Sequence, residues 1–308
     1  MPNGRVLITG GSGLLALNWA CAMRGTWDVV LGTHAHKVSL AGVASRPLDL
    51  ENTGQLSRQF EDLAPDIVVH AAGLTNVDRC EDDPALARHV NAELARDVAE
   101  AAASRNIRMV HVSTDHLFAG TRSGYREDDI PEPINEYARS KLLAEEWVKQ
   151  ADPRALIVRT NFFGWGHAGR QSFSDWIVYS LRAGREITMF DDVHFTPILA
   201  DALAAATHRL VDLSVSGTFN VAGDERVSKY EFAKRLAQAF SLPDELVRRS
   251  SVKEVGLHAN RPPDMSLDNA RARAVLGSSL GRLDDYLFAL RRQENEGRRE
   301  ELIHAVTE

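Results

Sequence analysis

Cysteine is nearly absent from this 308-residue chain, which has only Cys21 and Cys80. Two cysteines cannot form the disulfide framework that stabilises small secreted proteins, so we expect a reducing, cytoplasmic location. Long apolar runs are absent too, and without a stretch of about 18 apolar residues no transmembrane helix is expected. The first residues also lack the basic and apolar pattern of a signal peptide. The sequence therefore predicts a soluble protein.

The chain has fewer basic than acidic residues. It contains 36 Lys and Arg residues and 43 Asp and Glu residues, so its formal net charge is −7. This balance gives no electrostatic reason to expect nucleic acid or a membrane as a partner. Hydrophobic residues make up 44% of the chain and charged residues 26%, as in ordinary globular proteins. The last 18 residues, 291–308, are heavily charged, and we expect them to form an exposed helix that frays.

Short apolar runs alternate with helical patterns along the first half of the chain. The strands hold too few polar residues to face water, which is typical of a parallel sheet covered on both faces. The pattern therefore predicts an α/β fold with a doubly wound parallel sheet of the Rossmann type. The predicted strands are residues 5–9, 28–33, 66–72, 108–113 and 155–159, and the predicted helices are 14–23, 56–63, 84–103 and 136–150.

A glycine-rich turn follows the first predicted strand, with the spacing Gly10-x-x-Gly13-x-x-Ala16. Gly10 permits a tight turn, Gly13 lets the backbone approach a diphosphate at the helix N-terminus, and Ala16 allows close helix–strand contact. In a βαβ unit this spacing predicts a dinucleotide site, and a turn without a ligand is the alternative. The residues that we place at the cofactor here are Gly10, Ser12, Gly13, Leu14 and Leu15.

The alternation loosens after about residue 165, where we expect helices at 173–183 and 200–213 and strands at 187–190 and 217–221. The capping box Ser228-x-x-Glu231 then opens a further helix. We therefore expect a dinucleotide-binding Rossmann domain over residues 1–165, completed by a return segment at about 199–222. Residues 166–308 should form mainly a smaller α/β substrate-binding domain.

The end of the second predicted strand has no acidic residue to bind the adenosine ribose of NAD. Thr33, His34 and Lys37 can instead surround a 2′-phosphate, so the sequence favours NADP(H), with NAD(H) as the alternative. Asp49, followed by Leu50, fits a contact to the adenine amino group, although an ordinary loop acid is an equal alternative. No metal site is expected, since His34 has no set of further ligands at a useful spacing.

Tyr137 and Lys141 are four residues apart, on one face of the predicted helix 136–150. A nearby positive charge favours the phenolate, so we expect Lys141 to lower the pKa of Tyr137. Such a tyrosine can donate a proton to a carbonyl oxygen as hydride reaches the carbon, and the lysine can bind the nicotinamide ribose. A purely structural pair is the alternative, because this spacing is common by chance.

Two hydroxyls, Ser113 and Thr114, end the strand that precedes this helix. They lie at the carboxyl edge of the predicted sheet, where open α/β sheets bind their ligands. A hydroxyl there can hydrogen-bond a developing alkoxide. Strand alternation does not decide which of the two side chains points to the ligand, so both remain candidates.

Together with further segments, the glycine turn, the strand-end hydroxyls and the Tyr137 and Lys141 pair make the chain resemble the extended short-chain dehydrogenase/reductase family. Within that family it is most similar to the dTDP-4-dehydrorhamnose reductases. The resemblance covers nearly the whole chain. Beyond the glycine turn, the segments that carry it are Asp66-Ile67-Val68-Val69-His70-Ala71-Ala72-Gly73, Thr75-Asn76-Val77-Asp78-Arg79-Cys80-Glu81, Val112-Ser113-Thr114-Asp115-His116-Leu117-Phe118, Pro133-x-Asn135-x-Tyr137-x-x-x-Lys141-x-x-x-Glu145, Val158-Arg159-Thr160 and Arg261-Pro262-x-Asp264-x-Ser266-Leu267-Asp268-Asn269.

The resemblance implies a reductase of a 4-keto-6-deoxy nucleotide-sugar, as in dTDP-rhamnose biosynthesis, that uses NADP(H) or NAD(H) and can form a homodimer. It implies that Tyr137 is the general acid, Lys141 its partner, and Thr114 the hydroxyl that polarises the carbonyl, with Ser113 competing. Asp115 would position the sugar, or else cap the turn that follows it. The residues implied to line the cofactor in addition are Ala71, Ala72, Gly73 and Thr75.

The chain departs from these reductases after Thr160, where it has Asn161-Phe162-Phe163 instead of the usual serine and tryptophan. Phe162 can still cover a sugar face, but packing between the domains is an equal alternative for these aromatic residues. Arg261 matches a diphosphate in geometry, and a surface salt bridge is its alternative. The residues that we place around the nucleotide-sugar are Asn161, Phe162, Phe163, Phe173, His194, Thr196 and Arg261.

Other functions fit the same fold. An epimerase needs a base in the pocket, for which Cys80 is a candidate, although such a cysteine is more often simply buried. A dehydratase needs further acid/base groups, and Asp115 is followed by His116 rather than by a second carboxylate. A third hypothesis is a non-catalytic regulatory subunit that resembles the methionine adenosyltransferase beta subunit. The intact set of Tyr137, Lys141 and Thr114 favours the reductase.

Overall fold

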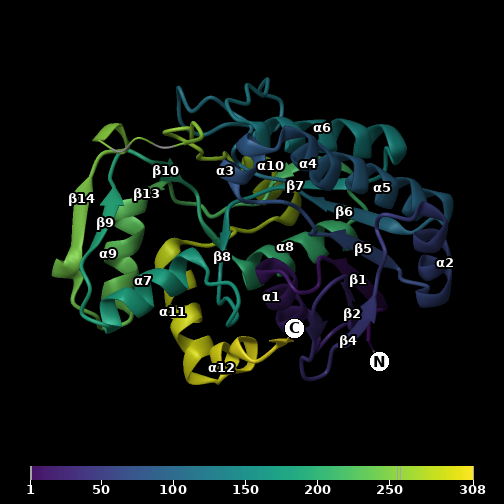
Figure 1. The fold of residues 1–308 in the computed structure, drawn as a ribbon, viewed down its shortest axis with the longest axis horizontal. Helices are drawn as coiled ribbons and strands as arrows, with labels where there is room; N and C mark the ends of the chain where they lie inside the picture. The colour runs from purple at the N-terminus through teal and green to yellow at the C-terminus, as the bar shows by residue number, and fades with distance from the viewer. Residues whose placement is uncertain (1, 255, 257, 308) are drawn as a thin grey trace.

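The computed structural model describes residues 2–254, 256 and 258–307. Figure 1 shows a larger lobe, built on a sheet with helices on both faces, beside a smaller lobe. Seven parallel strands of the described residues form this sheet, in the order β12-β7-β6-β5-β1-β2-β4. This is the strand order of a doubly wound fold, so the predicted Rossmann-type class is confirmed. The strands are β1 (Arg5–Thr9), β2 (Asp28–Thr33), β4 (Ala44–Pro47), β5 (Ile67–His70), β6 (Arg108–Val112), β7 (Leu156–Arg159) and β12 (Gly217–Asn220).

Both faces of the sheet are covered, which is why its strands are apolar along their whole length. In β1, Val6 and Ile8 face one side, Leu7 faces the other, and all three are fully buried. The first face packs against α1 (Leu14–Met23) and α8 (Ala200–Asp212). The second face packs against α2 (Thr53–Leu63), α5 (Leu94–Ser104) and α6 (Glu136–Ala151).

Some predicted elements differ in detail from the structure. The single helix predicted at 84–103 consists of α4 (Pro84–Arg88), a π-helical turn at His89–Glu93, and α5. Hydrophobic periodicity does not resolve such a turn, because only one residue is inserted. The strands predicted at 66–72 and 108–113 end earlier, at His70 and Val112, where the chain leaves the sheet. Within the described residues, no helix combines the length and the apolar composition needed to span a bilayer.

The smaller lobe pairs β9 (Ile187–Phe190) with β14 (Val247–Ser250), and β10 (His194–Phe195) with β13 (Val227–Ser228). Its core surrounds Phe232 of α9 (Lys229–Ala239), whose ring centroid lies 5.1 Å from that of Phe163 and 5.6 Å from those of Phe173 and Phe195. The predicted domain boundary at residue 165 stays a prediction. The other helices here are α7 (Phe173–Arg182) and α11 (Leu283–Asn295), whereas α10 (Ala270–Leu276) packs against α8 and β12 of the larger lobe. The short strand β8 (Phe162–Phe163) pairs with β11 (Ile198–Leu199).

The C-terminal segment packs onto the larger lobe, so the expectation of an exposed, fraying helix is wrong. In α12 (Arg298–Ile303), Leu302 is fully buried, and Glu301 accepts a 2.9 Å hydrogen bond from Arg24 on α1. Beyond it, β15 (Val306–Thr307) pairs with β3 (Lys37–Val38). Figure 1 shows the C-terminus close to β4 and α1. Many residues of this segment are charged, but its buried apolar residues and the contact between Glu301 and Arg24 fix its packing.

Candidate functional site

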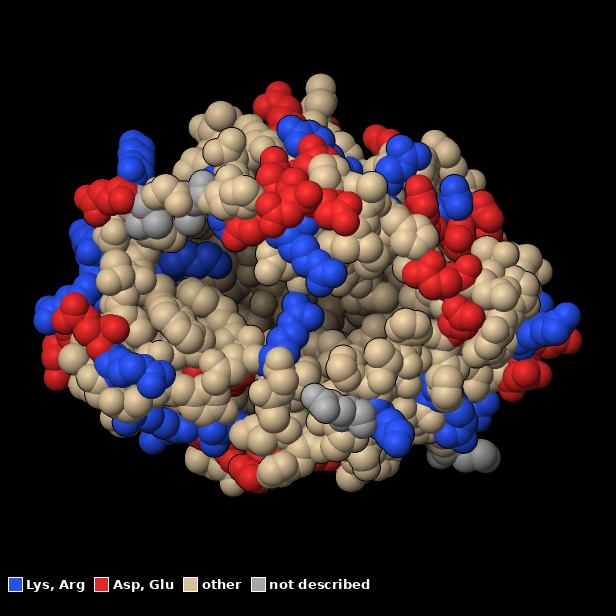
Figure 2. All heavy atoms as spheres, viewed as in Figure 1, with Lys and Arg blue, Asp and Glu red and all other residues tan. Residues whose placement is uncertain are grey.

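A hollow between the two lobes is visible in Figure 2, and the main cavity of the site lies at the carboxyl ends of the central strands. This central cavity has a volume of about 500 Å³. Most of its wall consists of residues that the sequence predicted for the site. These are Gly10, Ser12, Gly13, Leu14 and Leu15 after β1, Ala71, Ala72, Gly73 and Thr75 after β5, Ser113, Thr114 and Asp115 after β6, Asn161, Phe162 and Phe163 after β7, and Tyr137 and Phe173 from helices.

Two neighbouring cavities extend the central one in opposite directions. The β2 cavity, of about 260 Å³, shares Gly10, Ser12 and Ala72 with it. The α9 cavity, of about 430 Å³, shares Val77, His116 and Phe173 with it and is also lined by Lys229. The cavities therefore adjoin one another across the carboxyl edge of the sheet, in the arrangement that a long, segmented ligand requires.

The glycine turn lies against the end of β5. Gly10 has a φ of +67°, which favours glycine, and a Cβ atom there would lie only 2.8 Å from the Cα of Ala72. Any other residue at this position would therefore require the backbone at Ala72 to move. The Thr9 hydroxyl accepts hydrogen bonds of 3.2 Å from the backbone N–H groups of Ala71 and Ala72. These contacts hold the segment after β5 beside the turn, at the point where the strand order reverses.

The N-terminus of α1 opens into the central cavity. Gly13 is its N-cap, and no side chain of the described residues caps the first turn. Its backbone N–H groups are therefore available to a ligand, and the helix dipole adds a partial positive charge there. Leu14 and Leu15 line the cavity at this position. An uncapped helix N-terminus directly behind a glycine turn fits a diphosphate group.

The β2 cavity contains some of the residues predicted for the adenosine end and not others. Thr33, His34 and Leu50 line it, together with Glu51, which the sequence reasoning did not select. Lys37 lies outside this wall because it belongs to β3, where it pairs with Thr307. Asp49 also lies outside it, and its carboxylate accepts a 3.0 Å hydrogen bond from the backbone N–H of Glu51.

Tyr137 is placed by the start of α6. The side chain of Asn135 caps this helix by accepting a 2.8 Å hydrogen bond from the N–H of Ala138. The ring of His116 lies edge-on to the Tyr137 ring, with centroids 5.6 Å apart. Burial raises the pKa of Tyr137 to about 12, although the nearby Thr114 acts in the opposite direction. The expected lowering of this pKa is therefore wrong for this structure, because residue spacing does not show burial.

Lys141 lies one turn after Tyr137 but points into the sheet. Its ammonium donates a 2.8 Å hydrogen bond to the carbonyl of Val112 and lies 3.4 Å from Nε2 of His111. Burial lowers the pKa of Lys141 to about 8, against the effect of Glu145. The pKa of His111 is also well below its usual value, through burial and the lysine charge. The neutral imidazole of His111 can thus accept a hydrogen bond from the Lys141 ammonium without adding a second positive charge.

The Ser113 hydroxyl is committed to a buried ion pair. It donates a 2.6 Å hydrogen bond to Oε1 of Glu145, and Arg159 donates a 2.8 Å hydrogen bond to Oε2 of the same carboxylate. Burial would raise the pKa of Glu145, but Arg159 and Ser113 outweigh it and hold the pKa below its usual value. Ser113 therefore helps to hold β6, α6 and β7 together.

Thr114 and Asp115 face the ligand space. The Thr114 hydroxyl accepts from the N–H of His116 at 3.2 Å, and its donor bond to Asp115 is long, at 3.4 Å. Asp115 accepts a 2.7 Å hydrogen bond from the Asn161 amide. Burial raises the pKa of Asp115 to about 6, and Asn161 and Lys229 oppose this shift. Of the two candidate hydroxyls, the one on Thr114 is thus free to turn towards a ligand.

The sequence pattern of the family described as RmlD substrate binding domain matches residues 4–289. The chain belongs to this family. It is 33% identical over 288 residues to the probable low-salt glycan biosynthesis reductase of Haloferax volcanii, covering 92% of this chain and 96% of that protein. It is 29% identical to methionine adenosyltransferase 2 subunit beta of Bos taurus, covering 89% of this chain and 83% of that protein.

Solved structures of RmlD-type reductases have the same fold. The crystal structure of dTDP-4-dehydrorhamnose reductase from Bacillus anthracis, in complex with NADP, superposes with a TM-score of 0.84 at 27% identity. The superposition covers 95% of this chain and 100% of the reductase chain. The resemblance stated from the sequence motifs is therefore confirmed over the whole fold.

Of the residues predicted for the nucleotide-sugar, the structure brings together only some. Asn161, Phe162 and Phe173 line the central cavity, and Phe163 also packs against Phe232 in the core. Arg261 lines the α9 cavity.

His194 and Thr196 lie outside the walls of the cavities. The backbone N–H of His194 donates to the carbonyl of Pro263 at 2.8 Å, and the Thr196 hydroxyl accepts from the N–H of Leu267 at 3.1 Å. Both residues therefore hold the segment around Pro263 and Leu267 in place. The sequence placed them near the ligand, but it does not separate structural contacts from ligand contacts.

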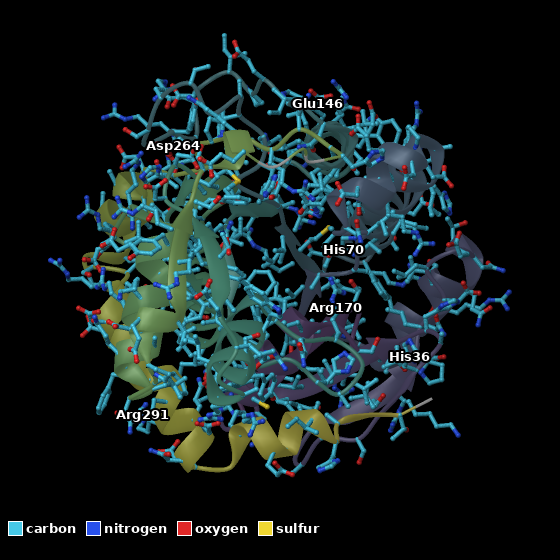
Figure 3. All side chains as sticks on the ribbon, turned by 60° about the vertical axis from the view of Figure 1, so that its left-hand side comes forward. His36, His70, Glu146, Arg170, Asp264 and Arg291 are labelled. Atoms are coloured by element: carbon cyan, nitrogen blue, oxygen red, sulfur yellow. The ribbon has the colours of Figure 1, made fainter. Side chains whose placement is uncertain are left out.

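Other side chains of the site were not predicted. Arg170, which Figure 3 labels, lines the central cavity, and its guanidinium donates a 2.6 Å hydrogen bond to the Thr75 hydroxyl. Nδ1 of His116 and the Thr160 hydroxyl are buried and have no hydrogen-bond partner within the described residues. Both residues line the central cavity, so these polar atoms can serve a bound ligand. His116 and Thr160 belong to quoted motifs, whereas Arg170 and Lys229 had no motif signal.

Proposed function

We propose that this protein is an NAD(P)H-dependent reductase of a 4-keto-6-deoxy nucleotide-sugar. The observation that carries the proposal is the position of Tyr137 and Thr114 on the wall of the cavity that begins at the uncapped N-terminus of α1. A proton donor, a second hydroxyl and a diphosphate-binding helix end thus share one space. The fold relation to a reductase solved with NADP supports the same function.

The residues of the site fit a nicotinamide dinucleotide. The diphosphate would bind at the N–H groups after Gly13, and the adenosine would occupy the β2 cavity beside Leu50. Ala71, Ala72 and Thr75 would line the nicotinamide half, and Lys141 would bind its ribose after turning from the Val112 carbonyl. When bound, the reduced nicotinamide supplies a hydride to the carbonyl carbon of the substrate.

Tyr137 would donate its phenolic proton to the carbonyl oxygen, so that the ketone becomes an alcohol and the phenol becomes a phenolate. Since burial raises its pKa to about 12, Tyr137 is protonated at neutral pH and ready to act as the donor. The Thr114 hydroxyl would hydrogen-bond the same oxygen as negative charge develops on it. The charge of Lys141 would stabilise the phenolate once it forms.

NADP(H) is the cofactor that we propose as preferred. Thr33 ends β2 and His34 follows it, so the strand end itself presents no carboxylate to a 2′-phosphate. The Glu51 carboxylate on the same wall is bonded to His89 at 2.8 Å. The variant His34→Asp should raise the KM for NADPH more than the KM for NADH, because a carboxylate repels the phosphate. Equal changes in the two constants would contradict this preference.

Reductase activity is tested by incubating the protein with dTDP-, GDP- and UDP-linked 4-keto sugars and following the absorbance of NADPH. We expect NADPH oxidation with at least one of them. Tyr137→Phe is the matched control, since it keeps the ring and removes only the proton donor. No oxidation with any substrate, despite NADPH binding, would refute the proposal.

That outcome would favour the second candidate, a regulatory subunit, for which the relation to methionine adenosyltransferase 2 subunit beta is the supporting observation. An epimerase that uses Cys80 has less support. The thiol of Cys80 is fully buried, and burial raises its pKa to about 11. A thiol in that state is a poor base at neutral pH.

A further inference from the structure

The α9 cavity contains two cationic residues in a largely apolar wall. Lys229 and Arg261 line it, and most of the remaining wall is made of Trp176, Met189, Phe190, Val193, Val252 and Met265. The rings of Phe173 and Trp176 are nearly parallel, at 16°, and remain 37% and 40% exposed. Large aromatic faces exposed at a cavity are suited to stacking on a flat heterocycle.

The two cations of this cavity differ in their partners. Arg261 donates a 2.9 Å hydrogen bond to the carboxylate of Asp78 and a second bond, of 3.2 Å, to the carbonyl of Ala259. Lys229 forms no ion pair with any carboxylate of the described residues. Its ammonium instead lies 3.3 Å from the ring centroid of Phe195 and 5.0 Å from that of Phe173. Arg261 is thus held in a direct ion pair, whereas Lys229 has no direct contact with a carboxylate of the described residues.

Asp115 is the carboxylate that faces Lys229 across the cavity, without a direct ion pair between the two side chains. Burial lowers the pKa of Lys229 to about 8, and Asp115 is the carboxylate that opposes this shift. His116 stays neutral, because burial and the charges of Lys229 and Arg261 lower its pKa to about 3. An anion bound beside Lys229 would contact the ammonium directly, which Asp115 does not, and would raise the pKa of Lys229.

The position of Lys229 relative to the reaction centre suggests which anion this is. The α9 cavity joins the central one at His116, whose ring lies against Tyr137. In a nucleotide-sugar the C4 carbonyl and the oxygen that carries the diphosphate lie on opposite sides of the sugar ring. With C4 at Tyr137 and Thr114, the diphosphate therefore lies one sugar ring away, towards Lys229, and the base lies beyond it.

We propose that Lys229 binds the diphosphate of the nucleotide-sugar and is the main anion-binding residue of the α9 cavity. This inference rests on the proposed function for the identity of the ligand. It moves to Lys229 the role that the sequence predicted for Arg261, whose guanidinium is held by Asp78. Phe173 and Trp176 would support the base. The competing interpretation is that Lys229 only packs over the Phe195 ring.

The test is calorimetric titration of the NADP⁺-saturated protein with thymidine diphosphate and uridine diphosphate. We expect the wild-type affinity to fall by up to about tenfold per pH unit between about pH 8 and pH 9, as the ammonium loses its proton. Phosphate charge does not change in this range, since its last ionisation lies near pH 6. Lys229→Met should bind at least about tenfold more weakly at neutral pH, with no fall on raising the pH.

Lys229→Arg separates charge from packing. A guanidinium stays charged up to about pH 12, so this variant should bind at neutral pH like the wild type and lose the decline above pH 8. The control is Lys234→Met on the same helix. Lys234 pairs with Asp244 at 3.1 Å and does not line the α9 cavity, so this variant should behave like the wild type.

The inference is overturned if Lys229→Met binds both nucleotides like the wild type, if Lys229→Arg keeps the wild-type decline, or if the wild type binds neither nucleotide. NADPH oxidation with 4-keto nucleotide-sugars is measured in parallel. Turnover without an effect of Lys229 on binding rejects this inference and leaves the reductase function in place. Nucleotide binding through Lys229 without turnover supports the inference and rejects the reductase function.

Discussion

Replacing Ser113 by alanine and Thr114 by valine separates a structural hydroxyl from one that acts in the reaction. The two residues are adjacent, and both lie at the end of β6 on the wall of the central cavity. Only the Ser113 hydroxyl is bound to the buried carboxylate of Glu145, at 2.6 Å. The Thr114 hydroxyl keeps a long donor bond of 3.4 Å and faces Tyr137.

We expect Ser113→Ala to lower mainly the stability and Thr114→Val to lower mainly kcat. Ser113→Ala removes a hydrogen bond to a buried charge, which costs about 1.5–3 kcal/mol of unfolding free energy. Its kcat should change by no more than about twofold, which corresponds to about 0.5 kcal/mol of activation free energy. Thr114→Val removes a donor to the developing oxyanion, which costs about 2.7–4 kcal/mol in the transition state and lowers kcat by about 10²–10³. The lost acceptor for the His116 N–H adds about 1 kcal/mol of destabilisation.

Steady-state NADPH oxidation with a 4-keto nucleotide-sugar gives kcat, and thermal unfolding followed by circular dichroism gives the stability of each variant. Thr114→Ser is the matched control, since it restores the hydroxyl and should recover most of kcat. The reasoning is refuted if Ser113→Ala loses about a hundredfold or more in kcat while Thr114→Val stays near the wild-type value.

Three further outcomes are expected. Tyr137→Phe should lower kcat by about 10²–10⁴ with little change in the dissociation constant of NADPH, which fluorescence titration measures. Arg170→Gln should raise the KM for NADPH by about tenfold and leave kcat nearly unchanged, since Arg170 lines the same cavity as the α1 N-terminus; an unchanged KM would contradict this. Unfolding free energy, measured with urea, should fall by about 1.4 kcal/mol per pH unit for each buried neutral imidazole as the pH drops below about 6.5, because the unfolded imidazole binds a proton there and the folded one does not. Burial lowers the pKa of His70 to about 3 and of His208 to about 4. His304→Gln, at an exposed position, should leave this slope unchanged.

The sequence predicted those parts of the site whose geometry is local. The strand, turn and helix over residues 5–23 were found as predicted, because the apolar run, the spacing of the glycines and the helical pattern are all contained in a few turns of chain. Asn135 and Tyr137 likewise belong to one helix start, so their relation is fixed by the backbone. The motif spacing also gave the strand ends that meet at the central cavity.

Other expectations depend on contacts from distant segments, which the sequence does not show. Lys37 stays a prediction for the adenosine end, and the structure adds that its strand, β3, pairs with β15 at the C-terminus. The pKa of Tyr137 was expected to fall beside Lys141, but burial by neighbouring elements raises it. Arg261 was chosen for its charge, and Asp78, which balances that charge, lies 183 positions away in the chain.

The amino-acid sequence alone determined the parallel sheet, the glycine turn and the pair of Tyr137 and Lys141, because these follow from periodicity and spacing along one segment. Only the tertiary structure decided which neighbouring hydroxyl is free, since Glu145 and Arg159 reach Ser113 from α6 and β7. It also placed Lys229 opposite Asp115 and His116. Desolvation and charge balance depend on all the elements that surround a group, and no single stretch of sequence contains them.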